Sequence, residues 1–129
     1  MTTQFNPQRQ NFVKYDDNHY LLFLNEQEAE QEDEFAGKII GYTYTGTMPD
    51  GSTLIEATGV TADNMRGKFI AGLIGLEYSL DDQIALLANG EDSEEHSEEL
   101  TRFLTFRQSV KEEIDKLLSA VTTPTPNVE

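Results

Sequence analysis

The feature that most constrains the fold is a helical repeat of apolar residues in the last third of the chain. It extends from about Ser93 to Ala120, and its apolar residues recur three and four positions apart. The repeating residues are Leu100, Phe103, Leu104, Val110, Ile114, Leu117, Leu118 and Val121. This spacing places them on one face of an α-helix. The sequence therefore predicts a long amphipathic helix, with more apolar surface than one small sheet and one partner helix can cover.

A second amphipathic helix is predicted immediately before the long one. Ser79 is a good N-cap, and Asp81 and Asp82 follow in the first turn, where the helix dipole favours acids. The apolar stripe consists of Leu80, Ile84, Leu87 and Ala88. Asn89-Gly90 is a suitable C-terminal stop. Together the two helices could form a bundle with another chain.

Two patterns compete in residues 61–76. Thr61 is a candidate N-cap, and Met65, Phe69, Leu73 and Leu76 follow at helical spacing. Three glycines weaken a helix, by up to about 1 kcal/mol each relative to alanine. The alternative is a strand over 68–74. We favour the helix.

The chain before Gly59 has a different composition, rich in β-branched and aromatic residues. Strands near 11–15 and 19–24 flank the turn-forming residues Asp-Asp-Asn and predict a hairpin. Strands over 38–45 and 52–58 flank Gly-Thr-Met-Pro-Asp-Gly and predict a second, clearer hairpin. The expected fold class is therefore α+β: a small antiparallel sheet of two hairpins (about four strands), followed by two or three helices, the last long and amphipathic.

The expected organisation is one domain over residues 11–121 between two disordered ends. Residues 1–10 lack periodicity and are expected to form a disordered tip, and residues 122–129 are expected to form a disordered, proline-broken tail. The predicted core consists of Phe12, Leu22, Phe23, Ile40, Tyr42, Ile55, Phe69, Leu73, Ile84, Leu87, Phe103, Leu104, Ile114 and Leu117.

The formal net charge of −15 argues against direct nucleic-acid binding and against anionic membranes, because both require lysines and arginines. No apolar stretch approaches the roughly 20 residues of a membrane-spanning helix. There is no cysteine, which excludes disulfides and thiolate chemistry. We therefore expect a cytoplasmic protein.

Acidic residues concentrate in two blocks, Glu26–Glu34 and Glu91–Glu99, with six acids each. The first block is interpreted as a solvated loop or frayed helix, with a short exposed helix as the alternative. The second is interpreted as a helix start, capped by Asp92 or Ser93. Metal binding is the competing hypothesis there, because His96 and Glu99 are one helical turn apart. The other ligands of a site are missing, so no metal site is predicted.

Enzyme motifs are absent from the sequence. It contains no phosphate-binding loop, no dinucleotide fingerprint and no serine in a nucleophile-elbow context. Carboxylate pairs carry little evidence, because 24 acids make them unavoidable. We assign no catalytic residue, expect no cofactor and predict that the protein is not an enzyme.

Two groups of residues are binding candidates. The first is the acidic face formed by Glu94, Glu95, Glu98 and Glu99. The second is Tyr42 and Tyr44, which share one face of a predicted strand with Ile40. The tyrosines are expected to cover the core, and the alternative is an exposed platform for a partner.

Three functions are compatible with these observations. The favoured one is a non-enzymatic structural, assembly or accessory protein that acts through protein–protein contacts, either with a protein partner or by self-association into an oligomer. A small hairpin-rich body with an acidic helical hairpin is typical of accessory proteins of bacteriophages and other mobile elements, although no motif identifies a family. The alternative is an acidic inhibitor that mimics nucleic acid towards a basic protein. A further alternative is a small peptide- or ligand-binding module.

Overall fold

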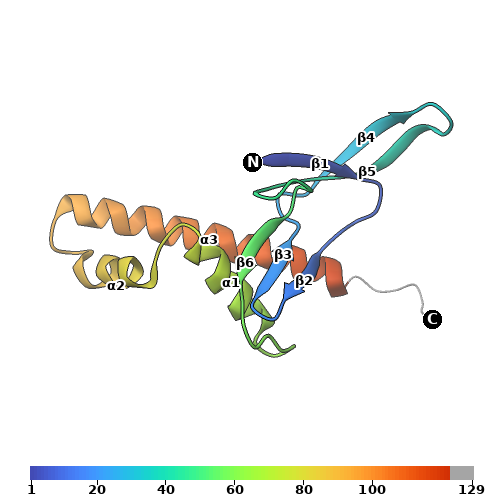
Figure 1. Cartoon of the computed structure of the whole chain (residues 1–129). Coiled ribbons are helices and arrows are strands. Elements are labelled where there is room, and N and C mark those ends of the chain that lie inside the picture. The colour runs from blue at the N-terminus through green and yellow to red at the C-terminus, as the bar shows by residue number, and fades with distance from the viewer. Residues whose placement is uncertain (123–129) are drawn as a thin grey trace.

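The computed structural model describes residues 1–122, with side chains through residue 119, and it has the predicted α+β fold. The described residues form two three-stranded antiparallel sheets and three helices (Figure 1). The strands are β1 (Thr2–Asn6), β2 (Phe12–Asp16), β3 (His19–Leu22), β4 (Gln27–Asp33), β5 (Gly37–Gly46) and β6 (Thr53–Glu56). The helices are α1 (Met65–Gly75), α2 (Leu80–Asn89) and α3 (Glu94–Thr122). Residues 123–129, most of the predicted tail, lie outside the described residues.

The first predicted hairpin is confirmed as β2 and β3, which pair antiparallel. Asp16 holds the turn between them, because its carboxylate accepts from the amide of Asn18 at 2.8 Å. β6 pairs with the other edge of β3, which completes the sheet β2-β3-β6. This sheet carries most of the buried strand residues.

The second predicted hairpin is wrong, because β5 and β6 belong to different sheets. The chain does reverse between them, where the amide of Met48 donates to the carbonyl of Ser52 at 2.8 Å. The strand before this turn, β5, pairs with β1 and β4, whereas the strand after it, β6, pairs with β3. The proline and Asp-Gly signal predicted a reversal correctly, but it does not determine which strands pair afterwards.

Two segments that were expected to lack strands supply the partners of β5. The acidic block is strand β4 and not a loop or frayed helix, and residues 2–6 form β1 and not a disordered tip. Alternation along β4 places Glu28, Glu30 and Glu32 on one exposed face, and the Lys38 ammonium lies 3.3 Å from the Glu30 carboxylate. Pairing with β5 therefore outweighs the repulsion between neighbouring acids.

The three predicted helices are confirmed, with one shifted start. Helix α1 begins at Met65, because Thr61 and Asn64 bond each other in a turn that precedes it: the Thr61 amide donates to Asn64 Oδ1 at 2.7 Å. Ser79 caps α2 as predicted, through a bond from the Asp82 amide at 3.1 Å. Ser93 accepts from the amide of His96 at 3.1 Å and starts α3.

The core lies between the sheet β2-β3-β6, helix α1 and α3. Leu22, Phe69 and Ile114 are fully buried there, and the rings of Phe12 and Tyr20 pack against Phe69 at centroid distances of 5.3 and 5.2 Å. Ile55, Phe103 and Leu117 are also buried as predicted. The core prediction was wrong at four positions, which are exposed to solvent: Ile40, Ile84, Leu87 and Leu104.

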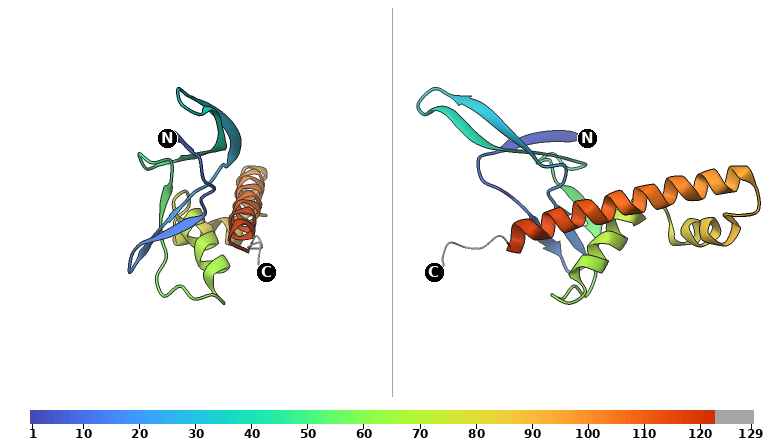
Figure 2. Two further views of the ribbon diagram at one scale, coloured as in Figure 1. Left: turned by 90° about the vertical axis from the view of Figure 1, so that its right-hand side faces the viewer. Right: turned by 180° about the vertical axis from the view of Figure 1, so that it is seen from behind.

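Helix α2 and the first two turns of α3 extend away from the body as a helical hairpin (Figures 1 and 2). We call residues 77–101 the arm. The β4–β5 hairpin projects from the other end of the molecule in both figures. Within residues 1–122, no helix is both long and apolar enough to cross a membrane.

Candidate protein-binding surface

The apolar stripe of α2 faces solvent. Leu80, Ile84 and Leu87 are 70%, 57% and 61% exposed, and no residue of α2 is buried. We call these three residues the α2 stripe. At 3.6 residues per turn they lie on one side of the helix. The sequence predicted this stripe correctly, but the expectation that Ile84 and Leu87 belong to the core is wrong.

The opposite side of α2 packs on α3. Leu86 and Leu100 are half-buried beside the main core, and Gly90 gives the end of α2 room to approach α3. A Cβ atom at Gly90 would lie 2.3 Å from Leu100 Cδ2. Before α2, the Tyr78 ring packs edge-on against Phe103 with centroids 4.9 Å apart. These contacts orient α2 so that its more apolar side points away from the rest of the chain.

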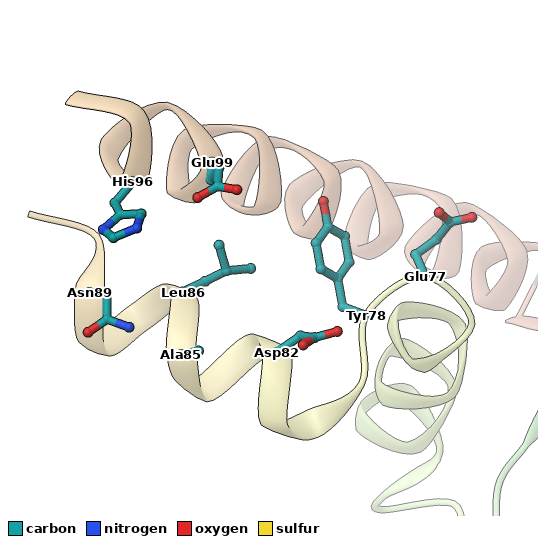
Figure 3. Close-up of a pocket in the computed structure, with 8 residues that line it drawn as sticks. All are labelled: Glu77, Tyr78, Asp82, Ala85, Leu86, Asn89, His96 and Glu99. Carbon is teal, nitrogen blue, oxygen red and sulfur yellow. The ribbon is translucent and has the colours of Figure 1, made fainter. Parts of the chain in front are cut away.

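A cleft of about 390 Å³ separates the two helices of the arm (Figure 3). Its lining residues are Glu77, Tyr78, Asp82, Ala85, Leu86, Asn89, His96 and Glu99. Figure 3 shows Glu77 at one end of the cleft and His96 near the other, so the acids are spread along it. His96 Nδ1 is buried without a hydrogen-bond partner. Among residues 1–122, no three His, Cys, Asp or Glu side chains are grouped closely enough to hold a metal ion.

The predicted acidic face lies at the start of α3. Glu94, Glu95 and Glu98 are exposed, whereas Glu99 is half-buried and lines the cleft. The whole arm is acidic: it contains nine Asp and Glu residues and no Lys or Arg. The charged surface of the arm is therefore acidic.

The two tyrosines lie on β5, far from the arm (Figure 1). Tyr44 is 1% exposed, so the exposed-platform hypothesis is wrong for it. Its hydroxyl donates to Glu26 Oε1 at 2.8 Å and accepts from the Gln10 amide at 2.8 Å. Burial, together with the Glu26 carboxylate, raises the pKa of Tyr44 to about 12. Tyr44 is therefore a structural residue, as the core hypothesis expected.

Tyr42 is half-buried, and the guanidinium of Arg9 lies over its ring, 5.9 Å from the centroid. Arg9 in turn makes a two-point contact with Glu26, with Nε at 3.1 Å and Nη2 at 3.0 Å from the two carboxylate oxygens. One face of Tyr42 is thus occupied by its own chain. The structure does not bring the tyrosines and the acidic face together into one site.

Sequence reasoning missed a second apolar surface, a groove of about 710 Å³ beside the sheet β2-β3-β6. Its apolar lining includes Met48, Leu54, Leu73, Leu76 and Phe106. These residues come from the β5–β6 turn, β6, α1, the α1–α2 connection and α3. No local pattern could reveal it, because its walls are distant in the sequence.

Comparison of the chain with protein families, with curated proteins and with solved structures finds no match.

Proposed function

We propose that this chain is a non-enzymatic assembly or accessory protein that acts through protein–protein contacts, and that the α2 stripe is its contact surface. The observation that supports the proposal is the exposure of Leu80, Ile84 and Leu87 on the side of α2 that faces away from α3. A helix whose stripe is directed to solvent leaves unused the burial that normally stabilises an amphipathic helix. A partner protein would supply that burial.

The size of this contact can be bounded. Complete burial of a Leu or Ile side chain stabilises by about 1.5–3 kcal/mol. Because the three residues are 57–70% exposed, a partner that covers them recovers about 1–2 kcal/mol each. Association costs at least about 4 kcal/mol in lost translational and rotational freedom. The stripe alone therefore supports a weak contact, and a tight complex needs further contacts from the surrounding surface.

The acidic composition favours the second candidate function, a nucleic-acid mimic that binds a basic protein. Glu94, Glu95 and Glu98 are exposed on consecutive turns of α3. A purely electrostatic decoy, however, has no need of an exposed row of aliphatic residues next to its carboxylates. We therefore place contact through the α2 stripe first. An origin in a bacteriophage or other mobile element stays a prediction.

Site-specific photo-cross-linking tests the proposal. A photoreactive residue placed at Ile84 should form covalent adducts in the cells that make the protein, and the adduct mass separates self-association from a different partner. The matched control is the same residue at Ala62, which is exposed and lies before α1, outside the arm. Equal adduct yields at the two positions would contradict the proposed contact surface.

A further inference from the structure

Acidic residues lie at both ends of α2, and one lies next to the α2 stripe in its first turn. Glu77 precedes α2, Asp81 follows Leu80, and Glu91 and Asp92 lie just beyond the end of the helix. All four are exposed, and none of them forms an ion pair in the described part of the chain. The arm contains no Lys or Arg that could neutralise them. The arm itself therefore supplies no positive charge to these acids, and the nearest basic residue along the chain is Arg102, directly after the arm.

A second copy of the same surface fits poorly. Two arms that met through their stripes would bring together two sets of nine acidic residues, and like charges across an interface oppose association. The basic residues elsewhere in the chain are partly engaged already. Arg9, Lys14, Lys38 and Arg66 lie within salt-bridge distance of carboxylates of their own chain. The charge pattern therefore favours a different protein over self-association.

The shape of the stripe favours a helix as the covering element. Leu80, Ile84 and Leu87 form a straight ridge along one helix, about 10 Å long at a rise of 1.5 Å per residue. Such a ridge packs into the groove between side chains of a second helix. An added β-strand has nothing to pair with here, because the backbone groups within α2 are used in the helix itself. A partner helix would extend the arm into a three-helix bundle.

We propose that the α2 stripe docks an amphipathic helix of another protein whose apolar face is flanked by lysines or arginines. This inference rests on the proposed function and names the class of partner. The apolar face of the incoming helix covers Leu80, Ile84 and Leu87, and its basic flanks meet Asp81 and Glu91. Attraction between the flanks and the arm adds to the weak apolar contact and steers the partner to it.

Three synthetic peptides test the inference by fluorescence anisotropy with the full chain. One is a helix-forming peptide with an apolar face and lysine flanks, and the second has the same apolar face with glutamate flanks. The third is a scrambled version of the first, with the same charge but no apolar face. We expect saturable binding of the first peptide only, with affinity that falls between about 0.05 and about 0.5 M salt because the surface charges are screened.

Two sets of variants connect the binding to the stripe. The double substitution Ile84→Ser and Leu87→Ser leaves the net charge unchanged and should weaken binding at least about tenfold, the effect of losing about 1.4 kcal/mol. Leu104→Ser is the matched control, because Leu104 is an exposed leucine of α3 outside the arm. Asp81→Asn with Glu91→Gln should reduce the salt dependence. The urea unfolding midpoint of the stripe variant should match that of the wild type.

Each alternative outcome has a distinct meaning. Equal binding of the lysine and glutamate peptides would overturn the role of charge. Equal binding of the lysine peptide and its scrambled version would show that the interaction is non-specific charge attraction, without a role for the apolar face. If no peptide binds but Ile84 cross-links in cells, the partner has another chemistry or is a second copy; the inference then fails and the proposed function stands. If Ile84 does not cross-link above the Ala62 control either, both fail.

Discussion

Tyr44 holds together three segments that are distant in the sequence, so removing its hydroxyl should destabilise the body. The hydroxyl accepts from the Gln10 amide and donates to Glu26, both at 2.8 Å. Glu26 also binds Arg9, and its carbonyl accepts from Lys116 of α3. Tyr44 therefore connects β5, the β1–β2 connection and the segment before β4 to a network that reaches α3.

The substitution Tyr44→Phe isolates the hydroxyl. The ring contact with Phe23, at a centroid distance of 5.4 Å, should survive. Two hydrogen bonds are lost, one to a charged group, and the Gln10 amide loses this acceptor. A neutral bond contributes about 0.5–1.5 kcal/mol and a bond to a charged group about 1.5–3 kcal/mol. Because Glu26 keeps its contact with Arg9, we expect a loss near the lower end, about 2 kcal/mol.

Urea unfolding followed by far-ultraviolet circular dichroism measures this loss, since the chain has no tryptophan. The midpoint should fall while the slope stays constant, because the surface exposed on unfolding is unchanged. The matched control is Tyr15→Phe, at a tyrosine that is 56% exposed, and it should stay within about 0.5 kcal/mol of the wild type. If Tyr44→Phe is also within that limit, the network does not stabilise the fold and the reasoning fails.

Stability should also depend on pH through Tyr44 and on two glycines of α1. Because burial raises the pKa of Tyr44 to about 12, the folded protein keeps a proton that the unfolded chain loses near pH 10, so stability should fall as pH rises from about 10 to about 12. The fall should be smaller in Tyr44→Phe, and urea midpoints measured against pH check this. In α1, Gly72→Ala should destabilise by about 1–3 kcal/mol, because its Cβ would lie 2.6 Å from the Glu56 carbonyl of β6. Gly67→Ala in the same helix meets nothing within 4 Å and should stabilise by up to about 1 kcal/mol; thermal unfolding of both variants tests the sign of each change.

The helices could be predicted because their signals are local. Ser79 and Ser93 each cap a helix through one bond to an amide three residues later, and that geometry depends only on nearby residues. The start of α1 was misplaced for a related reason. Thr61 and Asn64 are both suitable caps, and the sequence does not show that they bond each other before the helix begins.

The strands were predicted less well because a strand is stabilised by its partner. The acidic block has poor strand composition, and it becomes β4 only because β5 lies beside it along its whole length. Residues 2–6 become β1 for the same reason, on the other edge of β5. Neither pairing has a signal within the segment itself. Turn residues predict the position of a reversal at 48–52, but strand pairing depends on contacts between segments that are distant in the sequence.

The α2 stripe shows what an amphipathic pattern does and does not determine. Its spacing predicts that Leu80, Ile84 and Leu87 share one side of a helix, and this is confirmed. It does not specify which surface covers that side. Within the chain, α3 packs against the side of α2 that carries Leu86. Contacts of Tyr78 and Gly90 with α3 fix this orientation. Turning the stripe inward would expose Leu86, so the chain can bury one apolar side of α2 but not both. The second side is therefore left for contact with another molecule, and the acids around it restrict which molecules can approach.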